Sequence, residues 1–169
     1  MTNQSTKEIT YIGLGLAGMI VGGFAIYQVG AFFPIPGVKY ILMAPVLSMT
    51  FYLLTCLLNG KHIILKTGLV FATMMTMFNI YMGLSIVLAT LGSHTIQMLT
   101  KKQSYGAVAF SFFTGSGALL VSKYLIGGIF AQINLLGIFI TSMLCGLVGL
   151  YGVHIGSKIL YRIKLGKDI

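Results

Sequence analysis

The side chains that most often act as general bases, thiolate nucleophiles or metal ligands are scarce in this chain. Its 169 residues include three histidines, two cysteines and only two acidic residues. The two carboxylates, Glu8 and Asp168, lie near the two ends of the sequence, so the whole interval between them lacks an acid. The chain also lacks a glycine-rich phosphate-binding loop with the Lys-Ser/Thr signature of nucleotide hydrolases. The sequence therefore predicts neither carboxylate-based acid–base chemistry nor nucleotide hydrolysis.

The remaining reactive groups do not form a catalytic or metal-binding pattern. His94 and His154 lie within apolar segments, and no third ligand of carboxylate or thiolate type accompanies them, as a zinc site would need. Ser116 in the sequence TGSG would need His154 as its base, but the two residues are expected at different depths of their helices. Cys56 and Cys145 sit in apolar runs without paired spacing, as packing residues do. We expect no catalytic residue, no metal and no cofactor, and hence a protein that is not an enzyme.

The composition indicates the solvent in which this chain folds. Hydrophobic residues make up 57% of the chain and charged residues 8%, and the mean hydropathy is +0.96. Soluble domains carry about 25% charged residues, so this chain cannot cover a water-facing surface. Several apolar runs approach or exceed the ~20 residues that cross a bilayer core as a helix. We predict an all-α polytopic membrane protein, a bundle of six transmembrane helices forming a single domain over residues 1–169. The expected spans cover about residues 9–33, 40–58, 63–78, 82–99, 105–125 and 135–160.

The basic residues predict which way the bundle faces. The formal net charge is +9, which in a soluble protein would indicate nucleic acid as a partner. In a membrane protein the basic loop residues face anionic lipid headgroups instead, so we expect no nucleic-acid partner. With both termini in the cytoplasm, only Lys39 and Lys123 of the 11 basic residues lie outside. This bias follows the positive-inside rule and predicts an N-in/C-in orientation. The residues expected on the inner side are Lys7, Lys61, Lys66, Lys101, Lys102, Lys158, Arg162, Lys164 and Lys167.

All the prolines of the chain fall within residues 32–45, which have the sequence FFPIPGVKYILMAP. Proline lacks a backbone N–H, and the residue before a proline is pushed towards extended conformations. We therefore expect a compact, non-helical elbow at Pro34 and Pro36, between the first two spans and on the outer side. Pro45 falls in the early turns of the second span.

Three outer connections are expected to bring polar and aromatic side chains to the same side of the membrane. A small-molecule pocket needs mostly apolar walls with a few converging polar groups, and these connections would supply such groups. Alternatively, these are ordinary interfacial residues whose Lys and Tyr side chains extend to the headgroups. The sequence leaves both interpretations open. The candidate substrate-binding residues are Lys39, Tyr40, Asn79, Tyr81, Lys123, Gln132 and Asn134.

Small residues recur on the first span at a spacing that favours close helix packing. Gly13 and Ala17 are four residues apart, as are Gly18 and Gly22, so each pair lies on one helix face. Such a face packs either against another helix of the same chain or against a partner protein, and the spacing alone does not decide between them.

Three segments give the chain a resemblance to a known family. They are PGVKYILMAPVLSMTFYLL, NIYMGLSIVLATLGSHTIQML and KKQSYGAVAFSFF. With six short spans, a small-residue first helix, an outer proline elbow and a basic inner side, the chain resembles the substrate-binding (S) subunits of energy-coupling factor (ECF) transporters. It looks most like the less characterised branch of that family.

The resemblance implies that different subunits bind the substrate, form the transport path and hydrolyse ATP. An S subunit captures a vitamin or other micronutrient from outside the cell, in the prokaryotic cytoplasmic membrane. It then docks on a transmembrane coupling subunit that two cytoplasmic ATPase subunits drive, and it is thought to topple in the membrane to release its cargo. Partners implied in this way are the coupling subunit, the two ATPases, the small-molecule substrate and membrane lipid. The missing carboxylates and nucleotide motif fit a subunit that obtains its energy from partners.

The resemblance also implies roles for particular residues. The family contacts its coupling subunit through alanines four apart on the first helix, which here correspond to Gly13/Ala17 or Gly18/Gly22. The first outer loop of the family acts as a lid, which corresponds to Phe32–Tyr40 and includes Phe32, Phe33, Pro34 and Pro36. The nickel/cobalt branch needs a histidine directly after the initiator methionine, where this chain has Thr2, so that cargo is set aside. Lys39 and Lys123, which lack acidic neighbours, favour an anionic or carboxylate-bearing compound.

A second hypothesis of a different class is a non-transporting membrane accessory or assembly protein, held to its partners by small-residue helix contacts. The outer polar residues would then be interfacial anchors only. A passive channel ranks last, because no polar stripe runs through a full span.

Overall fold

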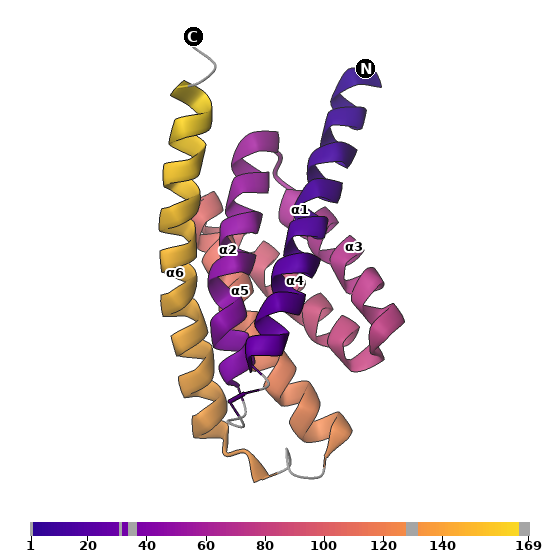
Figure 1. Cartoon of the computed structure of the whole chain (residues 1–169), viewed down its shortest axis with the longest axis vertical. Coiled ribbons are helices and arrows are strands. Elements are labelled where there is room, and N and C mark those ends of the chain that lie inside the picture. Colours follow the sequence, from indigo (N-terminus) through magenta and orange to yellow (C-terminus); the bar gives the residue numbers. More distant parts are fainter. Residues whose placement is uncertain (1, 31, 34–36, 128–131, 166–169) are drawn as a thin grey trace.

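The computed structural model of the chain describes residues 2–30, 32–33, 37–127 and 132–165. Within these residues the regular structure is entirely helical, which confirms the predicted all-α bundle (Figure 1). Pro34 and Pro36 of the expected elbow lie outside the described residues. The elements are α1 (Thr2–Gly30), α2 (Val38–Leu58), α3 (Ile63–Phe78), α4 (Ile80–Thr100), α5 (Gln103–Val121), the π-helix η1 (Ser122–Ile126) and α6 (Leu135–Leu165).

In the described part of the chain, five helices are long and apolar enough to cross a membrane, namely α1, α2, α4, α6 and α5 continued by η1. The exception is α3, whose 16 residues span about 24 Å at 1.5 Å per residue, against a bilayer core of ~30 Å. Asn79 alone separates α3 from α4, and the two helices run antiparallel as a hairpin. This hairpin begins and ends on the same side of the membrane however deep its corner reaches. The protein is thus a multi-pass membrane protein.

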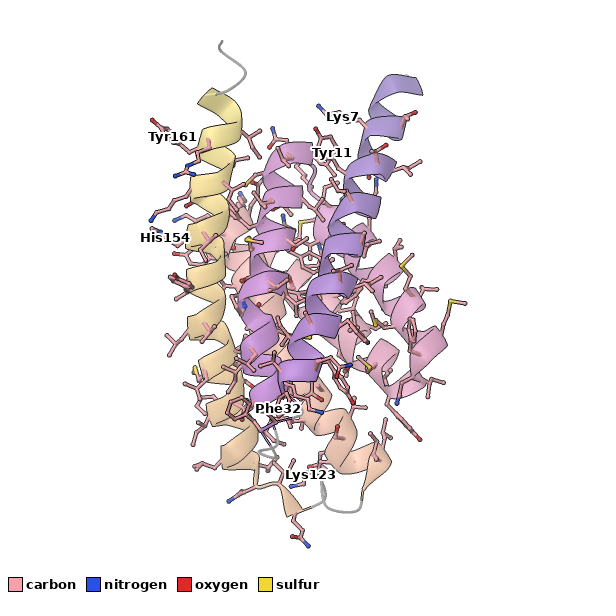
Figure 2. All side chains as sticks on the ribbon, in the orientation of Figure 1. Lys7, Tyr11, Phe32, Lys123, His154 and Tyr161 are labelled. Atoms are coloured by element: carbon pink, nitrogen blue, oxygen red, sulfur yellow. The ribbon has the colours of Figure 1, made fainter. Side chains whose placement is uncertain are left out.

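The two ends of the chain lie at the same end of the bundle, as an N-in/C-in arrangement requires (Figure 1). Figure 2 shows Lys7, Tyr11 and Tyr161 near that end, and Phe32 and Lys123 towards the opposite end. Tyrosine and lysine at the two ends of an apolar bundle are typical of residues at the two membrane interfaces. We refer to the end with the termini as the inner end and to the opposite end as the outer end.

The core of the bundle lies where α2 and α5 meet. Phe51 of α2 and Phe110 of α5 are fully buried, and their ring centroids are 4.0 Å apart. Around them, α2 packs against α1, α5 and α6, and α5 packs against α2, α4 and α6. Since α1 contacts chiefly α2, and α3 chiefly α4, these two helices lie at the periphery of the bundle.

Glycines on α6 allow α2 to approach it closely. A Cβ atom on Gly152 would meet the carbonyl oxygen of Pro45, and one on Gly156 would lie 3.1 Å from the ring of Tyr52. At the same crossing, the Ser48 hydroxyl donates a hydrogen bond of 2.8 Å to the carbonyl of Gly149. Lipid tails give helices no hydrophobic reason to associate, so close backbone contact and interhelical hydrogen bonds carry the packing.

The α2–α6 crossing yields a first prediction. The variant Gly152→Ala should lower the free energy of unfolding by about 1–3 kcal/mol, because its methyl group overlaps the Pro45 carbonyl and forces the helices apart. At ~2–4 °C per kcal/mol the melting temperature of the purified protein in detergent, followed by circular dichroism, should fall by several degrees.

Gly146→Ala is the matched control, since it lies on the same helix and its new Cβ would be 3.5 Å from Phe112, an ordinary contact. Both substitutions raise helix propensity equally. Equal melting temperatures for the two variants would contradict the tight crossing.

Candidate functional site

Two helices bring Lys39 and Tyr27 together at the outer end of the bundle. The Lys39 ammonium on α2 lies 4.3 Å from the centre of the Tyr27 ring on α1, within the range of a cation–π interaction. The aliphatic stem of Lys39 runs across the end of α1, since a Cβ atom on Gly30 would lie 2.8 Å from its Cγ. Tyr40, on the next position of α2, lies against the Ser122 side chain of η1. Of the candidate substrate-binding residues, Lys39 and Tyr40 therefore share a small cluster with Tyr27 and Ser122, which the sequence analysis did not include.

Lys123 and Asn134 shape the start of α6. The Lys123 ammonium donates a hydrogen bond of 2.7 Å to the carbonyl of Ile133 and lies 5.8 Å from the ring centre of Tyr124. The side-chain oxygen of Asn134 accepts a hydrogen bond of 3.4 Å from the backbone N–H of Leu136. Both side chains thus hold the connection into α6. Gln132, the third candidate in this region, is exposed to solvent or lipid.

Asn79 and Tyr81 lie at the corner between α3 and α4. The Asn79 side chain caps α4, accepting a hydrogen bond of 2.8 Å from the backbone N–H of Tyr81. The Tyr81 ring is exposed. Among the described residues, no hydrogen bond, ion pair or ring contact links this corner to Lys39 or Lys123. The capping role explains Asn79 without a ligand.

The described part of the expected lid consists of Phe32, Phe33 and the residues from Gly37 onward. The side chains of Phe32 and Phe33 are 83% and 50% exposed. Gly37 begins α2 with a φ of 98°, and a Cβ atom there would lie 2.9 Å from Thr141 of α6. Only glycine adopts this conformation readily and also leaves room for α6. Closure of the lid remains a prediction, because Pro34 and Pro36 lie outside the described residues.

The small residues of α1 divide between two faces. A Cβ atom on Gly13 or Gly18 would have nothing within 4 Å, and Ala17 is exposed. Gly22 does not share that free face, since its Cβ would lie 3.2 Å from Val46 of α2. Gly15 likewise faces α2. The open small-residue surface on α1 therefore consists of Gly13, Ala17 and Gly18, and we call it the α1 small-residue face.

Two of the three histidines lie side by side. His94 lies next to His62, with ring centroids 5.3 Å apart, whereas His154 is exposed on α6 and its side chain is drawn at the edge of the bundle in Figure 2. The Ser116 hydroxyl donates to the carbonyls of Phe112 and Phe113 on its own helix. In the described part of the chain no three His, Cys, Asp or Glu side chains gather as metal ligands would.

Buried polar atoms gather in the inner half of α3 and α4, a feature that the sequence analysis missed. In the described part of the chain, Thr67 Oγ1, His94 Nδ1 and Gln97 Oε1 are buried without a hydrogen-bond partner. Each such atom costs about 1–3 kcal/mol when left unpaired. The sequence does show polar residues inside these apolar runs. However, periodicity alone does not tell whether such residues face lipid or a neighbouring helix.

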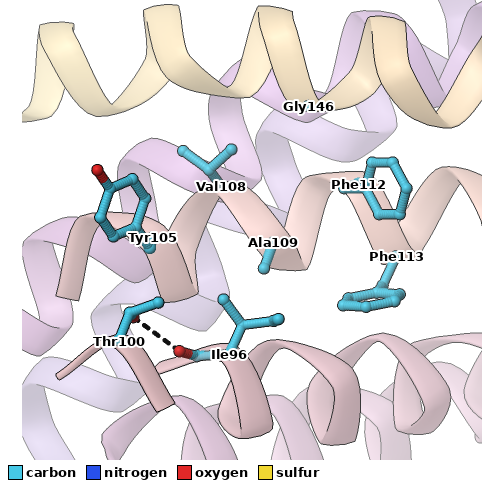
Figure 3. Close-up of a pocket in the computed structure, with 8 residues that line it drawn as sticks. All are labelled: Ile96, Thr100, Tyr105, Val108, Ala109, Phe112, Phe113 and Gly146. Atoms are coloured by element: carbon cyan, nitrogen blue, oxygen red, sulfur yellow. Dashed lines mark hydrogen bonds between the residues drawn. The ribbon is translucent and has the colours of Figure 1, made fainter. Parts of the chain in front are cut away.

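Two hollows on the described surface are lined by residues other than the outer candidates. One is a groove of ≈350 Å³ between α4, α5 and α6, shown in Figure 3. The other, of ≈100 Å³, lies beside Lys7, Glu8, Leu57 and Leu58 at the inner end. Next to it, Glu8 forms an ion pair of 2.6 Å with Lys66, which ties α1 to α3.

Comparisons of the chain with models of protein families, with curated proteins and with solved structures gave no match.

The different contacts of the two outer lysines predict different losses of stability when each is replaced. Lys123→Met should lower the free energy of unfolding by about 1.5–3 kcal/mol, because it removes a charge-assisted hydrogen bond to a backbone carbonyl that then loses its partner. Lys39→Met should cost only ~0.5–1 kcal/mol, since it removes a cation–π contact to an exposed ring. Chemical unfolding of both variants in detergent measures the difference. Equal losses would show that Lys123 has no larger structural role than Lys39.

Proposed function

We propose that this chain is the substrate-capture subunit of an ECF-type importer, which binds a small organic micronutrient from outside and delivers it through a partner coupling subunit powered by separate ATPases. The observation that carries the proposal is the α1 small-residue face. Many glycines elsewhere in the bundle lie against a neighbouring helix, whereas Gly13 and Gly18 face open space.

An unoccupied small-residue face on a peripheral helix supports docking by another membrane helix. Small residues let two helix backbones approach closely, which is the main source of helix association in lipid. Since α1 packs chiefly against α2, its other side is free for such a partner. This is the helix on which the resemblance to the S subunits implies contact with the coupling subunit.

The Lys39–Tyr27 cluster supports capture at the outer end. In the described part of the chain the Lys39 ammonium is held by a ring face alone, whereas that of Lys123 is committed to a carbonyl. An anionic ligand would gain a charge-assisted hydrogen bond from Lys39 at the cost of only a weak cation–π contact. Of the seven residues expected to bind substrate, Lys39 and Tyr40 are therefore the ones we retain for that role. Tyr27 joins them from the outer end of α1, the helix that carries the small-residue face.

Docking is tested with Gly13→Leu and Gly18→Leu, made together. Because nothing lies within 4 Å of either new Cβ, the isolated protein should keep its melting temperature, while the leucines should block close approach of a partner helix. We expect at least a tenfold loss of the coupling subunit and ATPases that co-purify with the tagged protein. Gly137→Leu on α6, where a Cβ would lie 3.9 Å from Ile133, serves as the control. If the wild-type chain binds no coupling subunit, or if the double variant retains it fully, the proposal fails.

Capture is tested with Lys39→Met and Tyr40→Phe. Native mass spectrometry of the detergent-purified wild-type protein should show a retained small molecule, and uptake of that compound by cells should fall about tenfold or more in the Lys39 variant. Asn79→Ala is the control, because its side chain caps α4 and should change stability rather than uptake.

The accessory or assembly protein is retained as a second candidate, because Lys123, Asn79 and Asn134 are engaged in local structural bonds. On that hypothesis no small molecule is retained and Lys39→Met leaves function intact, while the α1 double variant still disrupts a complex. The two functions therefore differ in the capture experiment and in whether a coupling subunit with ATPases co-purifies, whereas both predict that the α1 double variant loses its complex.

A further inference from the structure

The groove between α4, α5 and α6 has apolar walls along most of its length. Ile96 of α4, Val108 and Phe112 of α5 and Gly146 of α6 line it, and its volume is ≈350 Å³ (Figure 3). The absence of a side chain at Gly146 leaves space beside Phe112, whose ring would lie 3.5 Å from a Cβ there. In a membrane such an open apolar surface lies against lipid chains.

The inner end of the groove is polar and positively charged. Thr100 and Tyr105 line this end, and Figure 3 shows them on the same side of the groove, away from Phe112 and Phe113. Lys101 and Lys102 directly follow Thr100 in the connection from α4 to α5, and the Lys102 ammonium lies 5.3 Å from the centre of the Tyr105 ring. Among the described residues Lys66 forms an ion pair with Glu8, whereas Lys101 and Lys102 form none.

The start of α5 lies at this end beside the end of α4, whose partial negative charge opposes that of the α5 N-terminus, so the lysines supply the net positive charge. The first turn of α5 contains no acidic residue, and Lys102 at its N-cap provides no side-chain hydrogen bond to the first N–H groups. The N-terminus of a helix carries about half a positive charge. Two lysines therefore adjoin the lining residues Thr100 and Tyr105 at one mouth of an apolar groove, and N–H groups of the first turn of α5 lie at the same end.

We propose that the groove binds an anionic phospholipid of the inner leaflet, with an acyl chain along the apolar walls and the phosphate group at Lys101, Lys102 and Tyr105. Basic sites between transmembrane helices on the cytoplasmic side are typical of anionic-lipid recognition. The charge at the inner mouth favours an anionic lipid over an apolar protein segment, since a phosphate group would neutralise Lys101 and Lys102. The bound lipid completes the packing of α4, α5 and α6 where the protein leaves it open.

The experiment compares dioleoyl-phosphatidylglycerol with dioleoyl-phosphatidylcholine, which have the same chains and differ in net charge. Each is added to the delipidated full-length protein in detergent, and native mass spectrometry measures the lipid retained. We expect a preference for phosphatidylglycerol of roughly tenfold or more for the wild-type protein. We also expect a higher melting temperature with phosphatidylglycerol, because a ligand that binds the folded state stabilises it.

Two sets of variants separate the headgroup site from the chain site. Lys101→Gln with Lys102→Gln should abolish the preference for phosphatidylglycerol over phosphatidylcholine. Lys7→Gln with Lys66→Gln, an equal loss of inner-side charge beside Glu8 of α1, should keep it. Val108→Phe should reduce retention of both lipids by filling the groove. Thr100→Phe, at the exposed inner end, is a second filling variant should Val108→Phe fail to fold.

Several results would overturn the proposal. They are a wild-type protein without preference for phosphatidylglycerol, a preference that survives loss of Lys101 and Lys102, and an equal loss of preference in the Lys7/Lys66 control. Retained lipid in folded Val108→Phe and Thr100→Phe, combined with loss of a co-purifying protein, would assign the groove to a protein partner instead. These outcomes are independent of the transport function, since the lipid assay needs no coupling subunit.

Discussion

The close crossing of α2 and α6 is the contact on which the bundle depends. It joins the first half of the chain to its last helix, through the Ser48 hydroxyl on the Gly149 carbonyl and the Pro45 carbonyl packed on Gly152. In lipid such contacts replace the hydrophobic effect as the reason for two helices to stay together. Once α2 and α6 are fixed, α5 fills the space beside both, and Ser111 of α5 donates a hydrogen bond of 2.8 Å to the Ala44 carbonyl of α2. The core aromatic pair Phe51–Phe110 lies in the same central layer.

Glycines lie at closely packed helix contacts in some helices of this protein and on an open surface in another. Most glycines of α5 and α6 lie against a neighbouring helix: a Cβ on Gly115 would lie 2.8 Å from the Cys145 sulfur, and one on Gly117 would lie 3.1 Å from a backbone oxygen of α4. On α1, Gly13 and Gly18 are unoccupied. The same residue type therefore allows close helix contact inside the bundle and leaves one face of α1 open, where the proposed partner would dock. A docking helix at the periphery can engage a partner without disturbing the central α2–α5–α6 contacts, which suits a subunit that associates with a coupling protein and separates from it.

The two ends of the bundle use their cations differently. At the outer end Lys123 supports the backbone ahead of α6, and Lys39 lies over Tyr27. At the inner end Lys66 pairs with Glu8, while Lys101 and Lys102 form no ion pair among the described residues and lie beside an apolar groove. A residue count shows only that the inner side is basic. The contacts show that Lys123 and Lys66 form polar bonds within the fold, whereas Lys39 and Lys102 contact only aromatic rings among the described residues.

The sequence by itself determined the solvent, the helical class and the approximate positions of the helices, because these properties follow from composition and run length within single segments. The capping residue Asn79 and the glycines of α6 were visible in it as well, but only as residue types. The tertiary structure decided which neighbours they meet: Gly22 turns to α2 while Gly13 and Gly18 stay open, and His94 lies beside His62 rather than His154. It also placed Tyr27 under Lys39 and opened the groove beside Gly146. The physical reason is that hydropathy is a property of one helix in lipid, whereas an occupied face depends on the rotation of each helix about its axis against another segment.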